Sequence, residues 1–517
     1  MPRRRSRRPA HGPSSSRGFF AFVLAVLVLI AGVAVWRSGL FGGDGAPDAA
    51  GRTLFPDDPS EPSVSPSPTP SPTAGPINTE FAGLTTWRGN ATRSYYGEGP
   101  VPSGPVVRWR YPSSGGLCGP SDGATWCGTG WTGQPNVIEG EDGSIEVRIG
   151  AYDHDYHFLD GLTGEPVRNP LETGDLAKGS ATSDPDGYPL YYAGSRDNYF
   201  RIAALDRGQT PEVLWSIHSE TSVSNPVWND DWDGAALVID DYLLEGSENS
   251  WFYVIKLNRG YNDAGKVTVD PQVVAAVPGY DDQLFADLPD DDVSIESSVA
   301  FHDGVAYFVN SGGLVQGWDI SDILEGGTNI ERVFRYWNGN DSDGTIAIDE
   351  EGFLYVPRHG EERRSTTRET EVGDIMKLDP RKPDDPVVWS VHVELGSASD
   401  GGIWSTPALW GNFLYVTTHY GELIAINKTT GTVRWKVKFP EGHTWTSPLV
   451  VDDTLIVGDC GGILHAYDIS TPGRRPPELW TLNVDGTCIE STPAVFKGWI
   501  YVGTRGGGIY GIADPGA

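Results

Sequence analysis

The chain has 517 residues, with 38 basic and 70 acidic side chains and a formal net charge of -32. This length is too great for one small domain and suits one large repeat fold or roughly two to three ordinary domains. The 18 Trp, 21 Tyr and 17 Phe are too many for a uniformly disordered chain. Nucleic acid is a poor partner for so acidic a body, because its phosphates would be repelled.

The first predicted element is a membrane helix at residues 19–36, the uncharged run FFAFVLAVLVLIAGVAVW. A helix over this run would be about 27 Å long, just enough to cross a hydrocarbon core. Six arginines precede the run and one follows it. The positive-inside rule therefore predicts a cytoplasmic tail at residues 1–18 and an extracytoplasmic body, in a single-pass protein of the cell membrane. A cleaved signal peptide is the alternative, although its apolar region would be shorter and an A-x-A site would follow.

The next predicted element is a linker at residues 37–80, which contains EPSVSPSPTPSPTAGP. A Pro/Ser-rich stretch without hydrophobic periodicity cannot build a core. We therefore expect a disordered tether that crosses either a periplasmic or a cell-wall layer.

Four cysteines, Cys118, Cys127, Cys460 and Cys488, lie in the predicted exported part. Disulfides are the usual state of such cysteines, and four cysteines allow three pairings. We expect the pairs nearest in sequence, Cys118–Cys127 and Cys460–Cys488. A zinc site is the alternative, but no C-x-x-C spacing supports it.

The body at residues 81–517 is built of similar units of about 45 residues that end in tryptophan, as at Trp389, Trp435 and Trp480. Each unit begins with Ser/Thr-x-Pro and reads as four short strands separated by turn residues. Four antiparallel strands per unit form a β-propeller blade, and eight such units can be read in the sequence. The fold class is therefore an all-β, eight-bladed propeller. Residues 106–112, VVRWRYP, are expected to supply the missing fourth strand of the last blade and so to close the ring.

One unit carries the pattern A-x-[DN]-x-x-T-G-x-x-x-W, which is the tryptophan-docking motif of quinoprotein propellers. Its members are Ala425, Asn427, Thr430, Gly431 and Trp435. Residues 86–90, TWRGN, look like the W-R-G-N segment found ahead of such propellers. The chain therefore resembles the PQQ-like, eight-bladed propeller proteins, including outer-membrane assembly scaffolds of the BamB type. We expect the motif itself to be structural, with Trp435 buried against a neighbouring blade.

The resemblance implies a binding scaffold for an envelope protein or a small ligand, with no catalytic residues and no cofactor. A PQQ- and calcium-dependent dehydrogenase is the first alternative and a ligand-binding sensor the second. The dehydrogenases of this fold often carry a disulfide between adjacent cysteines, and this chain has no such pair. It also has no C-x-x-C-H haem motif to accept electrons.

A weak calcium candidate is Asn229-x-Asp231-x-Asp233-Gly234, the first half of an Asp-rich loop. Its twelfth position is Asp240 rather than Glu, so an acidic turn between strands is the alternative. Residues 153–157, DHDYH, could suggest a metal site, but they align with the hairpin turns of other units. We therefore expect them to decorate a hairpin.

Blade starts and hairpin turns should gather at the mouth of the channel, where aromatic rings and mixed charges suit a peptide or a sugar. The candidate binding residues there are Trp404, Trp445, Glu490, Arg505, His419, Asp459 and Arg196. Two insertions, residues 279–294 and 361–372, are further candidates for partner contacts, with solvated charged surface as the alternative.

Overall fold

The structure is a computed structural model that describes residues 83–130, 133–360, 367–393 and 401–517. The predicted membrane helix at residues 19–36 and the linker at 37–80 lie outside the described residues. Within the described ranges, no helix is long and apolar enough to cross a membrane.

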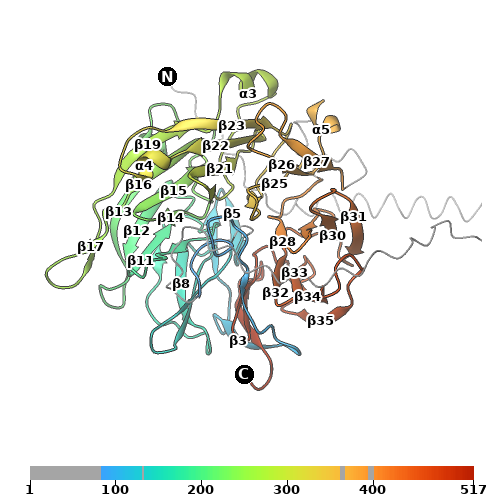
Figure 1. The fold of residues 1–517 in the computed structure, drawn as a ribbon. Coiled ribbons are helices and arrows are strands. Elements are labelled where there is room, and N and C mark those ends of the chain that lie inside the picture. The colour runs from blue at the N-terminus through green and yellow to red at the C-terminus, as the bar shows by residue number, and fades with distance from the viewer. Residues whose placement is uncertain (1–82, 131–132, 361–366, 394–400) are drawn as a thin grey trace, which may run out of the picture. The chain divides into compact units, whose positions relative to one another are not determined.

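Eight sheets of four main strands follow one another around a ring, as predicted (Figure 1). Blade 1 contains β6 (Asn136–Glu139), β7 (Ile145–Gly150), β8 (Asp155–Asp160) and β9 (Leu171–Glu172). Blade 2 contains β10 (Thr182–Ser183), β11 (Leu190–Ala193), β12 (Tyr199–Ala204) and β13 (Glu212–His218). Blade 3 contains β14 (Leu237–Ile239), β15 (Tyr242–Ser247), β16 (Trp251–Lys256) and β19 (Gln272–Pro278). Blade 4 contains β20 (Ala300–His302), β21 (Val305–Val309), β22 (Leu314–Asp319) and β23 (Glu331–Trp337).

The second half of the ring repeats this order. Blade 5 contains β24 (Ala347–Ile348), β25 (Leu354–Pro357), β26 (Ile375–Leu378) and β27 (Val387–Val391). Blade 6 contains β28 (Ala408–Trp410), β29 (Phe413–Thr417), β30 (Glu422–Asn427) and β31 (Val433–Lys438). Blade 7 contains β32 (Leu449–Val451), β33 (Thr454–Gly458), β34 (Ile463–Asp468) and β35 (Glu478–Asn483). Blade 8 contains β36 (Ala494–Phe496), β37 (Trp499–Gly503), β38 (Ile509–Ala513) and β3 (Val106–Tyr111).

A few short elements lie outside this pattern. Strand β1 (Gly83–Leu84) adds to the sheet of blade 1, and β2 (Gly97–Glu98) adds to the sheet of blade 8. Two separate hairpins are formed by β4 (Cys118–Ser121) with β5 (Ala124–Cys127) and by β17 (Gly260–Tyr261) with β18 (Val267–Thr268). The helices in the described ranges are α2 (Ser219–Ser222), α3 (Asp282–Asp287), α4 (Ser321–Leu324) and α5 (Arg368–Glu371).

The burial of the strands follows their place in the blade. The third strand of blade 6, β30, is buried at every interior position because both its faces are covered by neighbouring blades. Its outer neighbour β31 alternates, with Trp435 and Val437 buried and Arg434, Lys436 and Lys438 exposed. The core therefore consists of apolar layers between successive blades, and one such layer joins residues of blades 6, 7 and 8.

The ring is closed by the two ends of the propeller chain, as the sequence predicts. β3 pairs antiparallel with β38, from Val106 opposite Ala513 to Tyr111 opposite Ile509. In Figure 1 the blue strand β3 lies beside the red C-terminal strand. The carboxylate of Asp514 accepts hydrogen bonds from the backbone amides of Ser103 and Gly104, at 3.1 and 2.7 Å. This closure removes an open sheet edge from the last blade.

Residues 83–98 form a plug in the centre of the ring. β1 pairs antiparallel with β6, and β2 pairs parallel with β36, which are the first strands of blades 1 and 8. The first strands of neighbouring blades lie side by side around the axis. The backbone amides of Ser183, Phe301 and Ile348, in blades 2, 4 and 5, donate to carbonyls of this segment. The plug therefore ties most of the blades to one another through their innermost strands.

Two fully buried arginines fix the plug. Arg93 donates to the carbonyls of Val299 and Ala235 at 2.8 and 2.9 Å, and Arg88 donates to the carbonyl of Thr406 at 2.9 Å. Burial lowers the pKa of Arg88 to about 10 and that of Arg93 to about 9. Arg88 of the TWRGN segment and Arg93, three residues after it, therefore bind the plug to the surrounding blades.

Candidate functional site

The predicted binding residues come from two classes of loop that share one face of the propeller. Because successive strands of a blade run in opposite directions, the loop before the first strand and the turn between the second and third strands lie at the same end. We call this end the mouth face. Trp404, Trp445 and Glu490 belong to the first class of loop, and Arg196, His419, Asp459 and Arg505 belong to the second. The fold therefore brings all seven residues to one face.

An aromatic cluster lies at blades 5 to 7 of the mouth face. Trp404 stacks on His359 with ring centroids 4.0 Å apart, and it lies 6.0 Å from Trp445. The Nε1 of Trp445 donates to Nδ1 of His419 at 2.7 Å. His419 also lies edge-on to the ring of Tyr420, which is 37% exposed. Sequence reasoning found three of these rings and missed His359 and Tyr420.

A second group of predicted residues lies at blade 8. Arg505 donates to the carboxylate of Glu490 at 2.9 Å, as an ion pair with little solvent exposure. The guanidinium of Arg505 lies 5.2 and 4.7 Å from the ring centres of Trp126 and Tyr152. These two rings hold the cation by cation–π contact, and neither was predicted.

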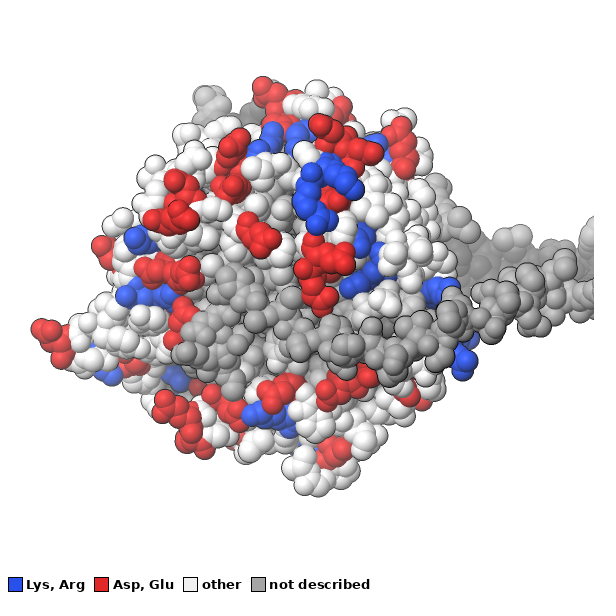
Figure 2. Space-filling model, viewed as in Figure 1, with Lys and Arg blue, Asp and Glu red and all other residues white. Residues whose placement is uncertain are grey.

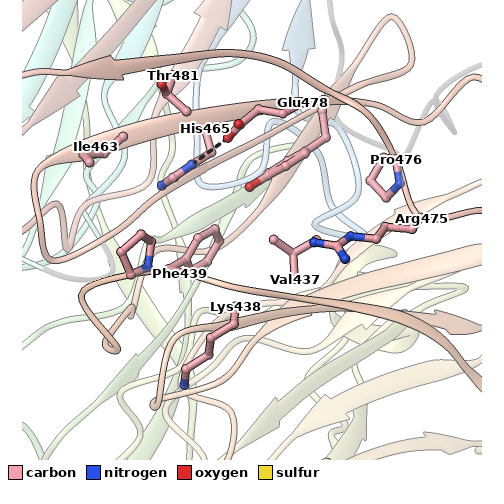
Figure 3. Close-up of a pocket in the computed structure, with 11 residues that line it drawn as sticks. Val437, Lys438, Phe439, Ile463, His465, Arg475, Pro476, Glu478 and Thr481 are labelled. Atoms are coloured by element: carbon pink, nitrogen blue, oxygen red, sulfur yellow. Dashed lines mark hydrogen bonds and ion pairs between the residues drawn. The ribbon is translucent and has the colours of Figure 1, made fainter.

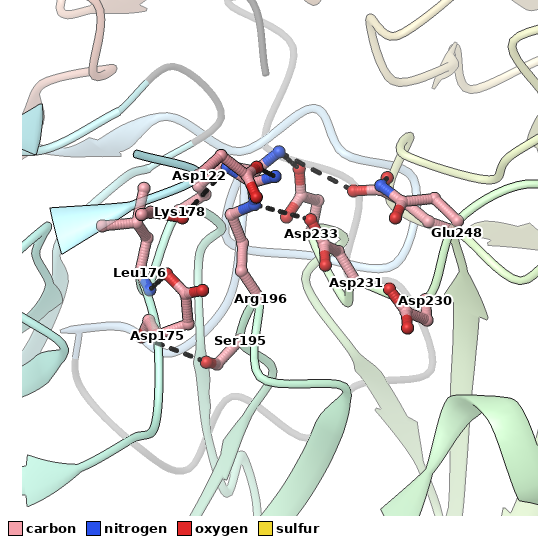
Figure 4. A network of polar contacts seen from close by, with 12 residues as sticks. Asp122, Asp175, Leu176, Lys178, Ser195, Arg196, Asp230, Asp231, Asp233 and Glu248 are labelled. Carbon is pink, nitrogen blue, oxygen red and sulfur yellow. Dashed lines mark hydrogen bonds and ion pairs between the residues drawn. The ribbon is translucent and has the colours of Figure 1, made fainter. Parts of the chain in front are cut away.

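Blades 2 and 3 hold a buried network of charges, which we call the polar basin (Figure 4). Arg196 donates to Asp231 at 2.7 Å and to Asp122 at 2.8 Å. Lys178 forms an ion pair with Asp233, and its Nζ lies 3.7 Å from Glu248. The cations belong to loops of blade 2, and most of the carboxylates come from the following blade. The network therefore joins neighbouring blades.

Burial shapes the protonation of the basin. It raises the pKa of Asp231 to about 7, against the opposing pull of Arg196 and Lys178. It also raises the pKa of Glu248 well above its usual range, helped by Asp233. Burial alone would lower the pKa of Lys178, but Asp233 and Glu248 hold it well above the usual value.

The calcium candidate is dispersed within this basin. The Nδ2 of Asn229 donates to Glu248 at 2.5 Å, Asp231 is held by Arg196, and Asp233 is held by Lys178. Asp233 instead shares a carboxylate cluster with Glu248 and Glu296. Each of the three predicted ligands is thus engaged by another side chain of the polar basin, and the calcium site stays a prediction.

The first disulfide closes a hairpin on the mouth face. The bond joins Cys118 to Cys127, which are paired across β4 and β5, as predicted. The amide of Leu117 donates to the carbonyl of Gly507 in blade 8, while Asp122 at the turn of the hairpin reaches Arg196 in blade 2. We call residues 118–127 the lid hairpin, because it extends from blade 8 to blade 2 over the mouth face.

Asp459 faces its own blade. Its Oδ1 accepts from the amides of Gly461 and Ile463 at 2.9 and 3.0 Å, which shapes the hairpin turn. Its Oδ2 lies 3.1 Å from Nε2 of His465. The next residue, Cys460, forms the second predicted disulfide with Cys488 and so ties the turn of blade 7 to the start of blade 8.

The acidic insertion at residues 279–294 is folded onto blade 4. Asp281 caps α3 through the amide of Leu284 at 2.9 Å and binds both Arg332 and Arg335. The hydrogen bond from Arg335 holds the pKa of Asp281 well below its usual range. Of the second insertion, residues 361–366 lie outside the described residues, and α5 begins at Arg368.

Two further carboxylate–histidine groups occur in the described part of the chain. Asp153, Asp155 and His157 lie at the start of β8, where Nε2 of His157 is 3.1 Å from Asp153. Asp341, Asp343 and His359 are buried, with 3.6 and 3.5 Å from Nε2 of His359 to the two carboxylates. The first group lies at the hairpin between β7 and β8, which is the position predicted, and the second was not found in the sequence because its members are brought together only by the fold.

Comparison with known proteins agrees with the resemblance seen in the sequence. Residues 371–516 match the family model described as outer membrane protein assembly factor BamB. The outer membrane protein assembly factor BamB of Shewanella oneidensis is 30% identical over 105 residues, which are 20% of this chain and 26% of that relative. The chain thus spans about a quarter of the length of this relative. Blades 6 to 8 and part of blade 5 therefore carry BamB-like propeller repeats.

Solved structures show the same fold at low identity. The computationally designed Ika8 protein matches with a TM-score of 0.50 and 13% identity, over 74% of this chain and 98% of that one. Sqt1 of Saccharomyces cerevisiae matches with a TM-score of 0.51 and 11% identity, over 72% and 93%. At such identities the likeness is one of fold and does not extend to function.

Proposed function

We propose that this chain is a membrane-anchored scaffold of the cell envelope, which holds a protein partner on its mouth face and has no catalytic activity of its own. The observation that carries the proposal is the plug. Residues 83–98 of the chain itself occupy the centre of the ring and bond to the innermost strands. The propeller is thereby a rigid platform whose loops are the natural place for contacts. The likeness to an assembly factor supports the same role.

The mouth face has the composition of a protein interface. The aromatic cluster offers Tyr420 and His443 at the surface, backed by Trp404 and Trp445. Aromatic rings and arginine are enriched at binding hot spots, because they bury a large area at a small loss of side-chain entropy. Arg505 and Glu490 supply a charged pair beside this area.

The dehydrogenase alternative finds less support in the side chains. Two of the predicted calcium ligands, Asp231 and Asp233, form ion pairs with Arg196 and Lys178 of the chain itself. Both disulfides join cysteines that are not adjacent in sequence, with separations of 9 and 28 residues. We therefore assign neither PQQ nor calcium to the scaffold.

The anchor and the compartment are part of the proposal. The apolar run at residues 19–36 and the arginines before it favour a single-pass topology with the propeller outside the cytoplasm. The two disulfides suit an oxidising compartment. A BamB-like propeller is expected to meet its partner in the envelope.

Site-specific photo-crosslinking in intact cells tests the scaffold. A photoreactive residue at Tyr420 or His443 should give a discrete adduct with one envelope protein. The matched control is Leu162, which is 53% exposed and lies in the turn between β8 and β9, at the opposite end of the blade. Absence of an adduct from the mouth face, or equal adducts from Leu162, would contradict the proposal.

A calorimetric titration of PQQ into the full-length protein, with and without calcium, tests the alternative. Under the scaffold hypothesis neither condition produces binding heat. Tight, calcium-dependent binding would overturn the scaffold and require dye-reduction assays with alcohols and sugars.

A further inference from the structure

A groove of about 490 Å³ lies between the outer parts of blades 6 and 7 (Figure 3). One end of it lies beside the mouth-face residue Asp459, which contacts the groove residue His465. Its walls come from the end of β31, from β34 and β35, and from the turn before β35. This volume is within the range of about 300–1,000 Å³ that is typical of ligand sites. The groove is therefore large enough to take one or two side chains of a partner.

The floor of the groove is aromatic and rigid. The ring of Phe439, which is buried, lies 4.7 Å from that of His465. His465 in turn stacks on Tyr467 with a centroid distance of 6.2 Å. Both nitrogens of His465 are engaged, by Asp459 at 3.1 Å and by Glu478 at 3.3 Å. A side chain that enters the groove therefore meets a fixed apolar surface.

Cations gather around this groove. Lys438 at the end of β31 lines the groove, and Arg434 and Lys436 lie on the same exposed face of β31, where Lys436 donates to the carbonyl of Val393 in blade 5. The outer strands β13, β19, β27 and β35 contain no lysine or arginine, whereas β23 and β3 carry two arginines each. The turn before β35 adds Arg474 and Arg475, and Gly473 of this turn lies near the guanidinium of Arg434. In Figure 3 the side chain of Arg475 extends over the groove toward Val437. Its charge also opposes the rise that burial causes in the pKa of Tyr467.

We call Arg434, Lys436, Lys438, Arg474 and Arg475 the basic patch. Its charge is opposite in sign to the net charge of the whole chain. The chain has a net charge of -32, and Figure 2 shows acidic side chains spread over one face among smaller basic groups. Arg332 and Arg335 of blade 4 share the single carboxylate of Asp281. Around the groove, the five cations of the basic patch stand against three carboxylates (Glu422, Glu441 and Glu478), of which Glu422 pairs with Lys436 and Glu478 contacts His465.

We propose that the groove between blades 6 and 7 binds an acidic peptide segment of a protein partner, with an apolar side chain on Phe439 and Tyr467 and a neighbouring carboxylate on Arg475. This inference rests on the proposed scaffold function and names the chemistry of the partner. A peptide fits better than nucleic acid or an anionic membrane, because a long polyanion would also meet the repulsion of the acidic body. A short acidic segment meets only the local patch.

The test is fluorescence polarisation with the full-length protein in mild detergent and two labelled ten-residue peptides of defined sequence. One peptide alternates Phe with Asp, and the other alternates Phe with Lys. We expect the Asp peptide to bind at least about tenfold more tightly and to weaken as salt is added. Equal binding of the two peptides, or no binding of either, would overturn the inference.

Paired variants separate the groove from general charge. Arg475→Glu should weaken the Asp peptide by about tenfold, whereas Arg474→Glu makes the same change of charge one residue away from the groove lining and should have a smaller effect. Thr481→Trp should obstruct the groove, and Asn483→Trp on the same strand should not. Equal effects within each pair would refute the site.

Anionic lipid vesicles serve as the competing probe. Tighter binding of vesicles than of the Asp peptide would also refute the inference. A negative peptide assay would overturn the groove proposal but not the proposed scaffold function, because the crosslinks from Tyr420 and His443 test that function independently.

Discussion

The indole of Trp389, in the outer strand of blade 5, lies against Gly431 in the last turn of blade 6. The Nε1 of Trp389 donates to the carbonyl of Lys428 at 2.9 Å, and a methyl group added to Gly431 would lie 2.9 Å from two ring atoms. The same contact closes the ring, where Trp109 lies against Gly164. The glycine of the docking motif therefore receives the tryptophan of the preceding blade.

Gly431→Ala should destabilise the propeller through this contact. Gly431 has a φ of 69°, where a side chain costs about 1 kcal/mol, and the methyl group would also collide with the indole. We expect the free energy of unfolding to fall by about 2–4 kcal/mol in urea denaturation. Gly486→Ala is the control, because Gly486 has a φ of 75° but open space around it. An equal loss in both variants would show that the indole contact is unimportant.

The sequence predicts the parts of this fold that depend on local pattern. The alternation of apolar and polar residues predicts the eight blades, the VVRWRYP segment predicts the closing strand β3, and the spacing of the cysteines predicts both disulfides. Contacts between residues that are far apart in the sequence could not be predicted from such local patterns. The motif does not reveal that Gly431 meets Trp389, since the pair belongs to two blades.

The candidate site shows the same division. The type of loop that holds a residue was enough to predict that all seven candidates lie on the mouth face. The direction of each side chain could not be predicted, because it depends on neighbours from other parts of the sequence. Asp459 turns inward because two turn amides and His465 bind its carboxylate. The partners of the predicted residues, such as Trp126 for Arg505 and Lys178 for Asp233, lie far away in sequence.

Substitution of Arg93 tests how much the plug contributes to the stability of the propeller. The side chains of Arg93 and Glu245 are both buried, and burial raises the pKa of Glu245 well above its usual range despite the opposing charge of Arg93. Arg93→Met removes the hydrogen bonds to three carbonyls and the positive charge that favours ionisation of Glu245. We expect a loss of about 3–5 kcal/mol in the free energy of unfolding.

The double variant Arg93→Met/Glu245→Gln completes this experiment. It replaces the group whose charge Arg93 supports with a neutral amide of similar shape, so part of the lost stability should return, as measured by urea denaturation. If the double variant is as unstable as the sum of the two single variants, the two charges do not interact and the plug is held by hydrogen bonds alone.

The polar basin should make stability depend on pH. Burial raises the pKa of Asp231 to about 7, so the folded state binds this proton more tightly than the unfolded chain. The resulting stabilisation is complete at low pH and is lost as the pH rises from about 4 to about 7. The free energy of unfolding should therefore be higher at pH 5 than at pH 8.

Asp231→Asn tests the assignment of that proton. It should reduce the difference between pH 5 and pH 8 by roughly 1–3 kcal/mol, since one pKa unit corresponds to about 1.4 kcal/mol. Some dependence should remain, because burial raises the pKa of Glu248 in the same direction. Identical pH profiles of the variant and the wild-type protein would assign the effect to other groups.

The lid hairpin should depend on its disulfide for local order. The loop between Cys118 and Cys127 is short, with a separation of 9 residues, and the chain-entropy model gives such a crosslink about 2–3 kcal/mol. In the variant with both cysteines replaced by serine, the hairpin keeps its strand pairing, the bond from Leu117 to Gly507, the ion pair between Asp122 and Arg196, and the contact of His154 with the carbonyl of Pro120. Amide hydrogen exchange at residues 118–127 should accelerate about 30- to 100-fold, while exchange in β38 stays unchanged.

The second disulfide provides the comparison for this effect. Replacement of Cys460 and Cys488 by serine should accelerate exchange at the junction of blades 7 and 8 and leave the lid hairpin protected. The two disulfides would then act on separate parts of the mouth face. If the loss of Cys118–Cys127 leaves exchange in the hairpin unchanged, the contacts with blades 2 and 8 are sufficient to hold the lid, and the disulfide adds little to its order.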